Sequence, residues 1–479
     1  MKIFEPLEIN GMAAPNRIYV PAMVTRLSGE DGRVNQDIVD RYARYASGGA
    51  GLIVVEAMAV HHFSAGPLLR ISHDSFIPGL SDLTRRIHDT SEAKVVPQII
   101  HFLKISRSGW RQTVDMLDHA EIGTIVDQFG DAVVRAREAG FDGAELHSAH
   151  GYTLASFVSR RNPREDEYGK SLEGRLRLIG RVMDNVRRKV GNDFPVGVRM
   201  NAEEFIRGGY TIEEAKLIAL RHAQLGCDYV SLSVGGKFED AEHHPGHVMH
   251  AYSGYSGERA MPDAWYPDML HVHLAAEIKA FLNAKGYTTP VITAGKIWRP
   301  KDAEAILAGG KADMLGIARQ LLADPDWPNK VRRGETDRII TCDYCNVCKA
   351  LDGSHEKVIC FLWPKGALQA PADDPDSVAP SWGEDGGGLA VTFKDGAANL
   401  KWSKAEGAAG YDVYRADDDG EVAIIEAAKV TRWPDRTVLA GMHYRYYVRA
   451  YDGSGRAGPP SNSVAIAPQI PDYADAGAA

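Results

Sequence analysis

The sequence predicts a (β/α)8 TIM barrel, an α/β fold, followed by a short cysteine-bearing segment and a small all-β domain. Short β-branched runs alternate with longer amphipathic stretches eight times between the start and about residue 335. Eight alternations fit a closed barrel better than an open doubly wound sheet. From about residue 387 the hydrophobic period falls to two, with turn signals between the runs, which is typical of a β sandwich.

The barrel elements follow one another in regular order. Strands are expected at 17–21, 51–56, 95–100, 142–146, 195–199, 228–231, 290–293 and 313–317. Amphipathic helices are expected between them, at 36–47, 122–138, 172–190, 212–224 and 301–307. Enzymes with this fold place their chemistry at the C-terminal ends of the strands, so the residues that follow each strand are the first candidates for a site.

Three parts account for the length of 479 residues. We expect the barrel over 1–340, a cysteine module with a Pro-, Asp- and Gly-rich linker over 341–385, and a β domain over 386–470. The last part resembles a fibronectin type III domain, with Trp402 as its core tryptophan and Tyr444 at its tyrosine corner. Domains of this kind bind or space other units, so we expect this one to hold a subunit contact or dock a redox partner.

Composition excludes several classes of partner. With 55 Lys and Arg against 64 Asp and Glu the net charge is −9, so no broad basic surface for nucleic acid or anionic lipid is expected. No run approaches the roughly 18 apolar residues of a membrane helix, and the start lacks the apolar core of a signal sequence. We therefore expect a cytoplasmic protein that acts on a small molecule, and we expect a homo-oligomer.

Four of the five cysteines gather in one short stretch and are spaced Cys-x2-Cys-x2-Cys-x11-Cys, at Cys342, Cys345, Cys348 and Cys360. In a reducing compartment such a cluster indicates a metal or iron–sulfur site more than a disulfide. Three thiolates within one loop can hold three corners of a [4Fe–4S] cluster, whereas structural zinc more often uses two separated pairs. The spacing favours the iron–sulfur cluster and leaves zinc as the alternative. Because such a cluster moves single electrons, it implies a neighbouring centre such as a flavin.

Polar and aromatic residues crowd the end of the fourth barrel strand. His147, His150 and Tyr152 put two imidazoles and a phenol within six residues. One histidine at such a position is more often structural, but three such side chains together favour a site. With the Asn-x-Arg-x-Asp-x-Tyr-Gly run over 162–169 and Arg199 in the fifth strand, they resemble the old yellow enzyme family. The cysteine spacing is similar to the iron–sulfur branch of that family, which contains 2,4-dienoyl-CoA reductase and trimethylamine dehydrogenase.

The resemblance implies an FMN cofactor. Matching the motifs residue by residue assigns its ring and ribityl chain to Pro21, Ala22, Met23, Ala57, Gln98 and Arg199. The same matching assigns its phosphate to Ala294, Gly295, Lys296, Ala318 and Arg319. Gln98 would hydrogen-bond the pyrimidine edge, and the fixed cation of Arg199 would stabilise the anionic reduced flavin. For Lys296 a solvated surface lysine is the competing interpretation.

The resemblance also implies catalytic roles. His147 and His150 would hold the oxygen of an activated carbonyl, so that hydride from flavin N5 reaches the β-carbon of the alkene. Tyr152 would donate a proton to the α-carbon, and a packed aromatic side chain is the competing interpretation.

Three departures from the relatives are visible. The loop after the first strand has no cysteine, so no covalent cysteinyl flavin is expected, and Thr25 takes the redox-tuning position. We do not expect the further nucleotide-binding domains of the relatives after residue 360, because the one Gly-x-Gly-x-x-Gly string there, over 453–458, lies within the period-two pattern of the small β domain. The long loop over 234–266 is expected to cover the flavin as a lid, and a metal site there is the weaker alternative. Its histidines are His243, His244, His247 and His250.

These features favour reduction of an activated C=C bond in an enoyl or dienoyl thioester or an enone. The principal alternative is an amine or N-methyl dehydrogenase that passes electrons from FMN through the cluster. The pair of His147 and His150 favours the first reaction, and the cysteine spacing favours the second. In either case we expect electron exchange with a ferredoxin or an electron-transfer flavoprotein, and NAD(P)H stays open as an external donor. A third possibility is a flavin-free scaffold whose β domain is the working part.

Overall fold

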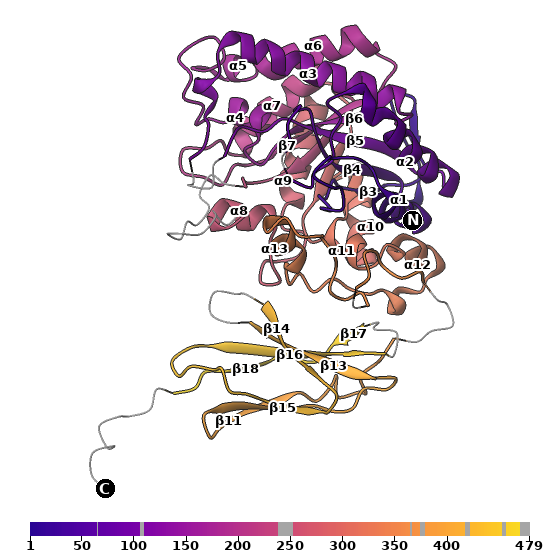
Figure 1. Ribbon diagram of the computed structural model, residues 1–479, viewed down its shortest axis with the longest axis vertical. Helices are drawn as coiled ribbons and strands as arrows, with labels where there is room; N and C mark the ends of the chain where they lie inside the picture. Colours follow the sequence, from indigo (N-terminus) through magenta and orange to yellow (C-terminus); the bar gives the residue numbers. More distant parts are fainter. Residues whose placement is uncertain are drawn as a thin grey trace, which may run out of the picture.

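The structure is a computed structural model that describes residues 1–64, 66–105, 110–237, 252–364, 366–373, 379–416, 422–452 and 457–469. Eight parallel strands close a barrel in the order β10-β3-β4-β5-β6-β7-β8-β9 (Figure 1). They are β3 (Ile18–Val20), β4 (Leu52–Ala59), β5 (Lys94–Ile100), β6 (Ala144–Ser148), β7 (Val196–Asn201), β8 (Val230–Ser233), β9 (Val291–Ala294) and β10 (Met314–Gly316). Every expected strand is present, within three residues of its expected bounds, which confirms the predicted barrel.

Helices surround the barrel and continue beyond its last strand (Figure 1). They are α1 (Gln36–Ser47), α2 (Ile77–Thr90), α3 (His119–Glu138), α4 (Thr153–Val158), α5 (Leu172–Arg175), α6 (Arg177–Val190), α7 (Ile212–Gln224), α8 (Gly254–Ala260), α9 (Val272–Ala284), α10 (Pro300–Ala308), α11 (Arg319–Ala323), α12 (Trp327–Arg333) and α13 (Val347–Gly353). Short 3-10 turns lie at Lys2–Phe4, Asp74–Phe76, Val114–Met116 and Thr336–Arg338. In the described part of the chain, no helix is both long enough and apolar enough to cross a membrane.

A hairpin that the sequence analysis missed closes the amino-terminal end of the barrel. It pairs β1 (Leu7–Ile9) with β2 (Met12–Ala14) through a turn in which Asn10 and Gly11 both have positive φ, 46° and 82°. Asn-Gly is the preferred pair for such a turn, so the signal was present in the sequence. The buried side chains of Ile9 and Met12 pack against the lower barrel core with Tyr229.

Two antiparallel sheets form the C-terminal part, as predicted. One contains β11 (Ala390–Lys394), β12 (Ala397–Lys401) and β15 (Arg432–Asp435). The other contains β13 (Gly410–Ala416), β14 (Val422–Ala428), β16 (Tyr444–Tyr451), β17 (Ala457–Pro460) and β18 (Val464–Ile466). Trp402 lies in their common core, and the Leu439 N–H donates to the Tyr444 hydroxyl at 2.9 Å, as a tyrosine corner requires. The resemblance to fibronectin type III domains stays a prediction.

Candidate active site

One pocket opens at the carboxyl ends of the barrel strands. Its lining includes all fourteen predicted flavin-binding and catalytic residues, namely Pro21, Ala22, Met23, Ala57, Gln98, His147, His150, Tyr152, Arg199, Ala294, Gly295, Lys296, Ala318 and Arg319. The space inside it, counted out to the open side, is about 1280 Å³. The barrel therefore brings these fourteen residues together from the ends of seven strands, and Leu232 and Ser233 of β8 complete the lining at the end where this fold places its chemistry.

The two imidazoles lie close to each other at the end of β6. Their ring centroids are 5.2 Å apart. The Ala149 N–H donates to Nδ1 of His147 at 3.2 Å, so the remaining proton of a neutral ring is on Nε2. Nε2 of His150 lies 2.7 Å from the Ser233 hydroxyl, and His150 itself has a left-handed backbone with φ of 58°.

Burial keeps these imidazoles neutral. Burial, together with the positive charges of Arg199 and Lys237, lowers the pKa of His147 to about 3. Burial, the neighbouring His147 and the same two cations also hold the pKa of His150 well below its usual range. A neutral imidazole retains one N–H, so each ring can donate a hydrogen bond to a carbonyl oxygen without carrying a charge.

Two tyrosines lie beside the imidazole pair. The ring of Tyr152, at the start of α4, is 4.8 Å from that of His147. Tyr252, which also lines the pocket, has its pKa raised mainly by burial and also by a hydrogen bond with Tyr152. Tyr252 was expected only as part of a lid. The other members of that expectation, His243, His244, His247 and His250, lie outside the described residues.

A buried polar network underlies the pocket. Nε2 of Gln98 donates to Glu145 at 2.7 Å, which leaves the amide oxygen of Gln98 for another partner. Arg199 donates to the hydroxyls of Ser231 at 2.9 Å and Ser233 at 3.3 Å. Burial raises the pKa of Glu145, whereas Arg199 opposes that shift. The network fixes Gln98 on β5 and Arg199 on β7, on either side of Glu145 in β6, before any ligand arrives.

At the predicted phosphate site, the side chains of Lys296 and Arg319 are already bound to other parts of the protein. Lys296 is only 7% exposed, and its ammonium donates to the backbone carbonyls of Asp263, Ala264 and Tyr266. Arg319 donates to the carbonyl of Pro262 and to the side chain of Asn346. The two cations thus hold the segment over 262–266 against the barrel, a partnership that no sequence motif indicated.

Thr25, the expected tuning residue, is directed away from the pocket. Its hydroxyl donates to Glu56 at 3.0 Å, and its N–H donates to the same carboxyl group. Glu56 is fully buried, and burial raises its pKa to about 7. Thr25 is absent from the described pocket lining, which includes Met23 and Val24 from the same loop.

The four clustered cysteines lie together beside the pocket, and none of them forms a disulfide. Burial, the negative charge of Asp343 and the neighbouring thiolates raise the pKa values of Cys342, Cys345 and Cys360. Among the described residues, no three of these sulfur atoms lie within 4.8 Å of one another.

The cysteine segment also forms part of the pocket wall. Cys348, Tyr344 and Asp352 line the pocket with the barrel residues. The Gln320 side chain, one residue after Arg319, accepts a hydrogen bond from the Cys342 N–H at 3.0 Å. A group held by the cysteines would therefore lie next to a group held in the pocket.

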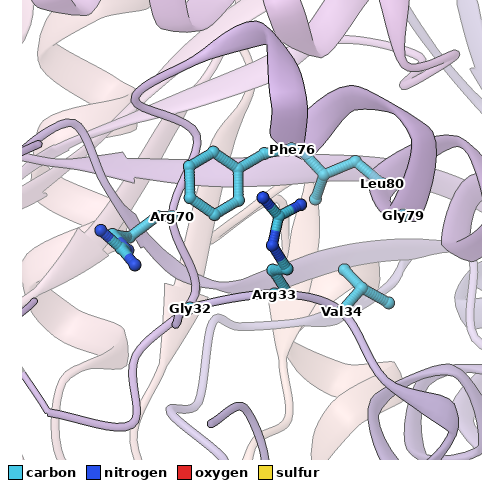
Figure 2. Close-up of a pocket in the computed structure, with 7 residues that line it drawn as sticks. All are labelled: Gly32, Arg33, Val34, Arg70, Phe76, Gly79 and Leu80. Carbon is cyan, nitrogen blue, oxygen red and sulfur yellow. The ribbon is translucent and has the colours of Figure 1, made fainter. Parts of the chain in front are cut away.

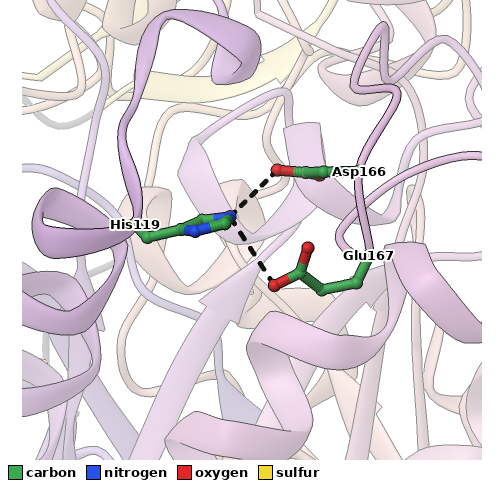
Figure 3. A group of neighbouring side chains, drawn as sticks. All are labelled: His119, Asp166 and Glu167. Atoms are coloured by element: carbon green, nitrogen blue, oxygen red, sulfur yellow. Dashed lines mark hydrogen bonds and ion pairs between the residues drawn. The ribbon is translucent and has the colours of Figure 1, made fainter.

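Two other polar arrangements lie outside this pocket. Nε2 of His119 lies 3.2 Å from Asp166 and 3.6 Å from Glu167 (Figure 3). Asp166 is already paired with Arg164, and this ion pair holds the pKa of Asp166 well below its usual range. These contacts stabilise the Asn-x-Arg-x-Asp-x-Tyr-Gly run rather than a metal ion.

The second arrangement is a smaller pocket at the start of α2 (Figure 2). Arg33 and Arg70 lie over the ring of Phe76, at 5.1 and 5.2 Å from its centroid. Arg33 donates to the carbonyl of Ser75 at 2.8 Å, and Arg70 donates to that of Asp31. Because both guanidinium groups already have partners, this pocket is a structural feature of the loop.

Residues 2–108, 103–256 and 260–338 match the NADH:flavin oxidoreductase / NADH oxidase family. The chain belongs to this family. The match covers the whole barrel and confirms the predicted resemblance to flavin-dependent oxidoreductases. It ends at residue 338, before the first clustered cysteine, so it carries no information on the cysteine segment or the β domain.

Three curated relatives bear different names. An NADH oxidase of Thermoanaerobacter brockii is 34% identical over 370 residues, which cover 72% of this chain and 53% of the relative. An N,N-dimethylglycine/sarcosine dehydrogenase of Chromohalobacter salexigens is 29% identical over 465 residues, 92% of this chain and 63% of the relative. A cinnamate reductase of Clostridium sporogenes is 29% identical over 378 residues, 72% of this chain and 54% of the relative. The chain spans less than two thirds of the length of each.

Proposed function

We propose that this protein binds FMN in the strand-end pocket and reduces an activated C=C bond, in an enoyl or dienoyl thioester or an enone. The family supports the flavin. The observation that carries the reaction is the pair of neutral imidazoles in the pocket wall, those of the buried His147 and the half-buried His150. Two neutral donors suit a carbonyl oxygen that gains negative charge during reaction.

The flavin-binding roles follow from how the pocket residues are held. Gln98 offers its free amide oxygen to the pyrimidine edge, and Arg199 places its positive charge beside it. The backbone at Gly295 and Lys296 and the side chain of Arg319 are the proposed phosphate ligands, while the Lys296 ammonium stays on its carbonyls. FMN, when bound, supplies hydride from N5 of its ring.

Substrate activation falls to the imidazole pair. His147 and His150 hold the carbonyl oxygen and lower the energy of the enolate that forms as the β-carbon receives hydride. Tyr152 donates a proton to the α-carbon. Hydride and proton together add two electrons and two protons across the C=C bond. Tyr252, hydrogen-bonded to Tyr152, is placed to return a proton to that phenol.

The cysteines are the proposed ligands of a [4Fe–4S] cluster, which passes single electrons when bound. Cys348 lines the same pocket as the flavin-binding residues, so electrons would have a short path between the two groups. We propose that the cluster exchanges electrons with a ferredoxin or an electron-transfer flavoprotein in the cytoplasm, with NAD(P)H as a second possible donor and a homo-oligomer as the working form.

The alternative function is oxidation of an amine or N-methyl compound. It is supported by the relative named N,N-dimethylglycine/sarcosine dehydrogenase and by the cysteine spacing. The carboxylate of Asp352 in the pocket wall is a possible partner for a cationic amine, but Arg26 already binds it at 2.9 Å. The relative named cinnamate reductase supports the first reaction.

Anaerobic stopped-flow absorbance of the FMN band separates the two reactions. Reduced protein mixed with cinnamoyl thioester should regain the oxidised flavin spectrum within seconds. Oxidised protein mixed with N,N-dimethylglycine should keep its spectrum. Bleaching by the amine without reoxidation by the thioester would reverse the assignment, and colourless protein after anaerobic reconstitution would overturn both enzyme functions in favour of the flavin-free scaffold.

A further inference from the structure

The β domain packs directly on the cysteine segment. Figure 1 shows the segment that carries α13 between the barrel and the sheet of β13, β14, β16 and β17. Ala457 of β17 belongs to one buried cluster with Cys342, Tyr344 and Leu362. The β domain therefore contacts the cysteine segment directly, in addition to its covalent connection through the linker.

An aromatic stack continues this contact. Tyr414 and Tyr447, on adjacent strands, stack with centroids 4.5 Å apart and planes 7° apart. The ring centroid of Phe361, the residue after Cys360, lies 5.2 Å from that of Tyr414. The Tyr447 hydroxyl donates to Asp343 at 3.1 Å. The β domain thus contacts the chain next to both the first and the last of the four cysteines.

Arg449 is the most unusual residue of this interface. It is only 2% exposed, yet it carries a permanent charge. Its guanidinium donates to the carbonyl of Thr341 at 3.2 Å, and its Nε lies 4.0 Å from Asp343, so it contacts the residues on either side of Cys342. Among the described residues its Nε has no hydrogen-bond partner.

A buried cation with one distant carboxylate is costly unless further negative charge lies nearby. The nearest source is the cysteine segment, because an iron–sulfur cluster held by four thiolates carries net negative charge. We propose that the β domain is the outer wall of the cysteine site, and that Arg449 is a positioning residue whose charge favours the reduced form of the iron–sulfur cluster. This inference rests on the proposed function, specifically on the cluster.

The physical reason is electrostatic. Reduction adds one electron and no proton to the cluster, so its negative charge grows by one. A fixed positive charge in a poorly hydrated interface stabilises the more negative state and raises the reduction potential. Without Arg449, the cluster should be harder to reduce.

An EPR-monitored redox titration of the full-length reconstituted protein tests this inference, with dithionite as reductant. Arg449→Met should lower the equilibrium constant for one-electron reduction about tenfold, which is about 59 mV toward negative potential. Arg449→Lys keeps the charge and should stay close to the wild-type potential. Arg432→Met removes an exposed arginine from β15 in the outer sheet and serves as the matched control.

The outcomes are distinguishable. If wild-type protein contains iron and sulfide but Arg449→Met and Arg432→Met have the same potential, the inference fails while the proposed function stands. If wild-type protein takes up no iron–sulfur cluster, the relay in the proposed function fails as well. Should Arg449→Met not fold, Tyr447→Phe supplies the test of the wall. It removes the hydroxyl bound to Asp343 and should alter the EPR line shape, and an unchanged spectrum would overturn the wall.

Discussion

The pocket has two walls of different construction. The barrel wall is made of strand ends whose polar side chains bond to their neighbours across adjacent strands, as Gln98 does with Glu145 and Arg199 with Ser231. The cysteine wall, residues 342–360, is held instead by side chains from remote parts of the chain, Gln320 from the barrel and Arg449 from the β domain. A substitution in the first wall should therefore act locally, and one in the second should depend on contacts between domains.

Loss of one cysteine ligand should have the largest effect and should remove the cluster while leaving the flavin in place. Cys342→Ala should abolish the iron–sulfur EPR signal and reduce turnover with a protein electron donor at least ~100-fold, because a cubane needs its four thiolates. The FMN spectrum should remain, since the flavin pocket is lined mainly by barrel residues. Cys227→Ala, in the barrel core, is the matched control. Normal turnover of the Cys342 variant with the protein donor would refute the relay.

The barrel wall gives the second effect. His147→Ala removes one donor to the carbonyl oxygen, and kcat/KM for cinnamoyl thioester should fall by about 10²–10³. The iron content and EPR spectrum should match the wild type. His88→Ala, a surface histidine paired with Asp142, controls for loss of an imidazole. A variant that lost the cluster together with activity would show that the two walls are not independent.

The third prediction concerns Lys296, which binds the segment over 263–266 to the barrel. Lys296→Met removes the charged donor to three backbone carbonyls of the segment over 263–266 and should lower the free energy of unfolding by about 2–3 kcal/mol. FMN affinity should change less than threefold, because the ammonium is bound to the protein. Denaturant unfolding and flavin fluorescence measure the two quantities. A large loss of FMN affinity at unchanged stability would assign the ammonium to the phosphate.

The smallest effect concerns the barrel away from the pocket. His222 in α7 is fully buried, neither ring nitrogen has a partner among the described residues, and burial lowers its pKa to about 4. The unfolded chain, with a pKa near 6.5, binds a proton that the folded chain does not, so stability is lost as pH falls from about 6.5 to 4. Between pH 7 and 5, wild type should lose about 2 kcal/mol more than His222→Leu. Thermal and denaturant unfolding measure these losses. If wild type and His222→Leu lost the same free energy of unfolding between pH 7 and 5, His222 would not be neutral and buried.

The sequence predicted the barrel wall better than the cysteine wall for a physical reason. Strand periodicity and strand-end motifs are local, so His147, Gln98 and Arg199 could be placed in one pocket once eight strands were recognised. The carbonyl partners of Lys296 and the contact of Arg449 with Thr341 join residues far apart in the chain, and no local pattern encodes them. The β1–β2 hairpin was missed for a different reason, because its Asn-Gly turn is a local signal that the sequence contains.

Two redox groups are proposed to share the pocket, one on each wall. An anaerobic dithionite titration of reconstituted full-length protein, followed by absorbance, counts the electrons that they take up. Two electrons for FMN and one for a [4Fe–4S] cluster predict an uptake of about three electrons per chain. Uptake of about two electrons, with a flavin spectrum and no iron, would contradict the claim by leaving the cysteine wall without its group.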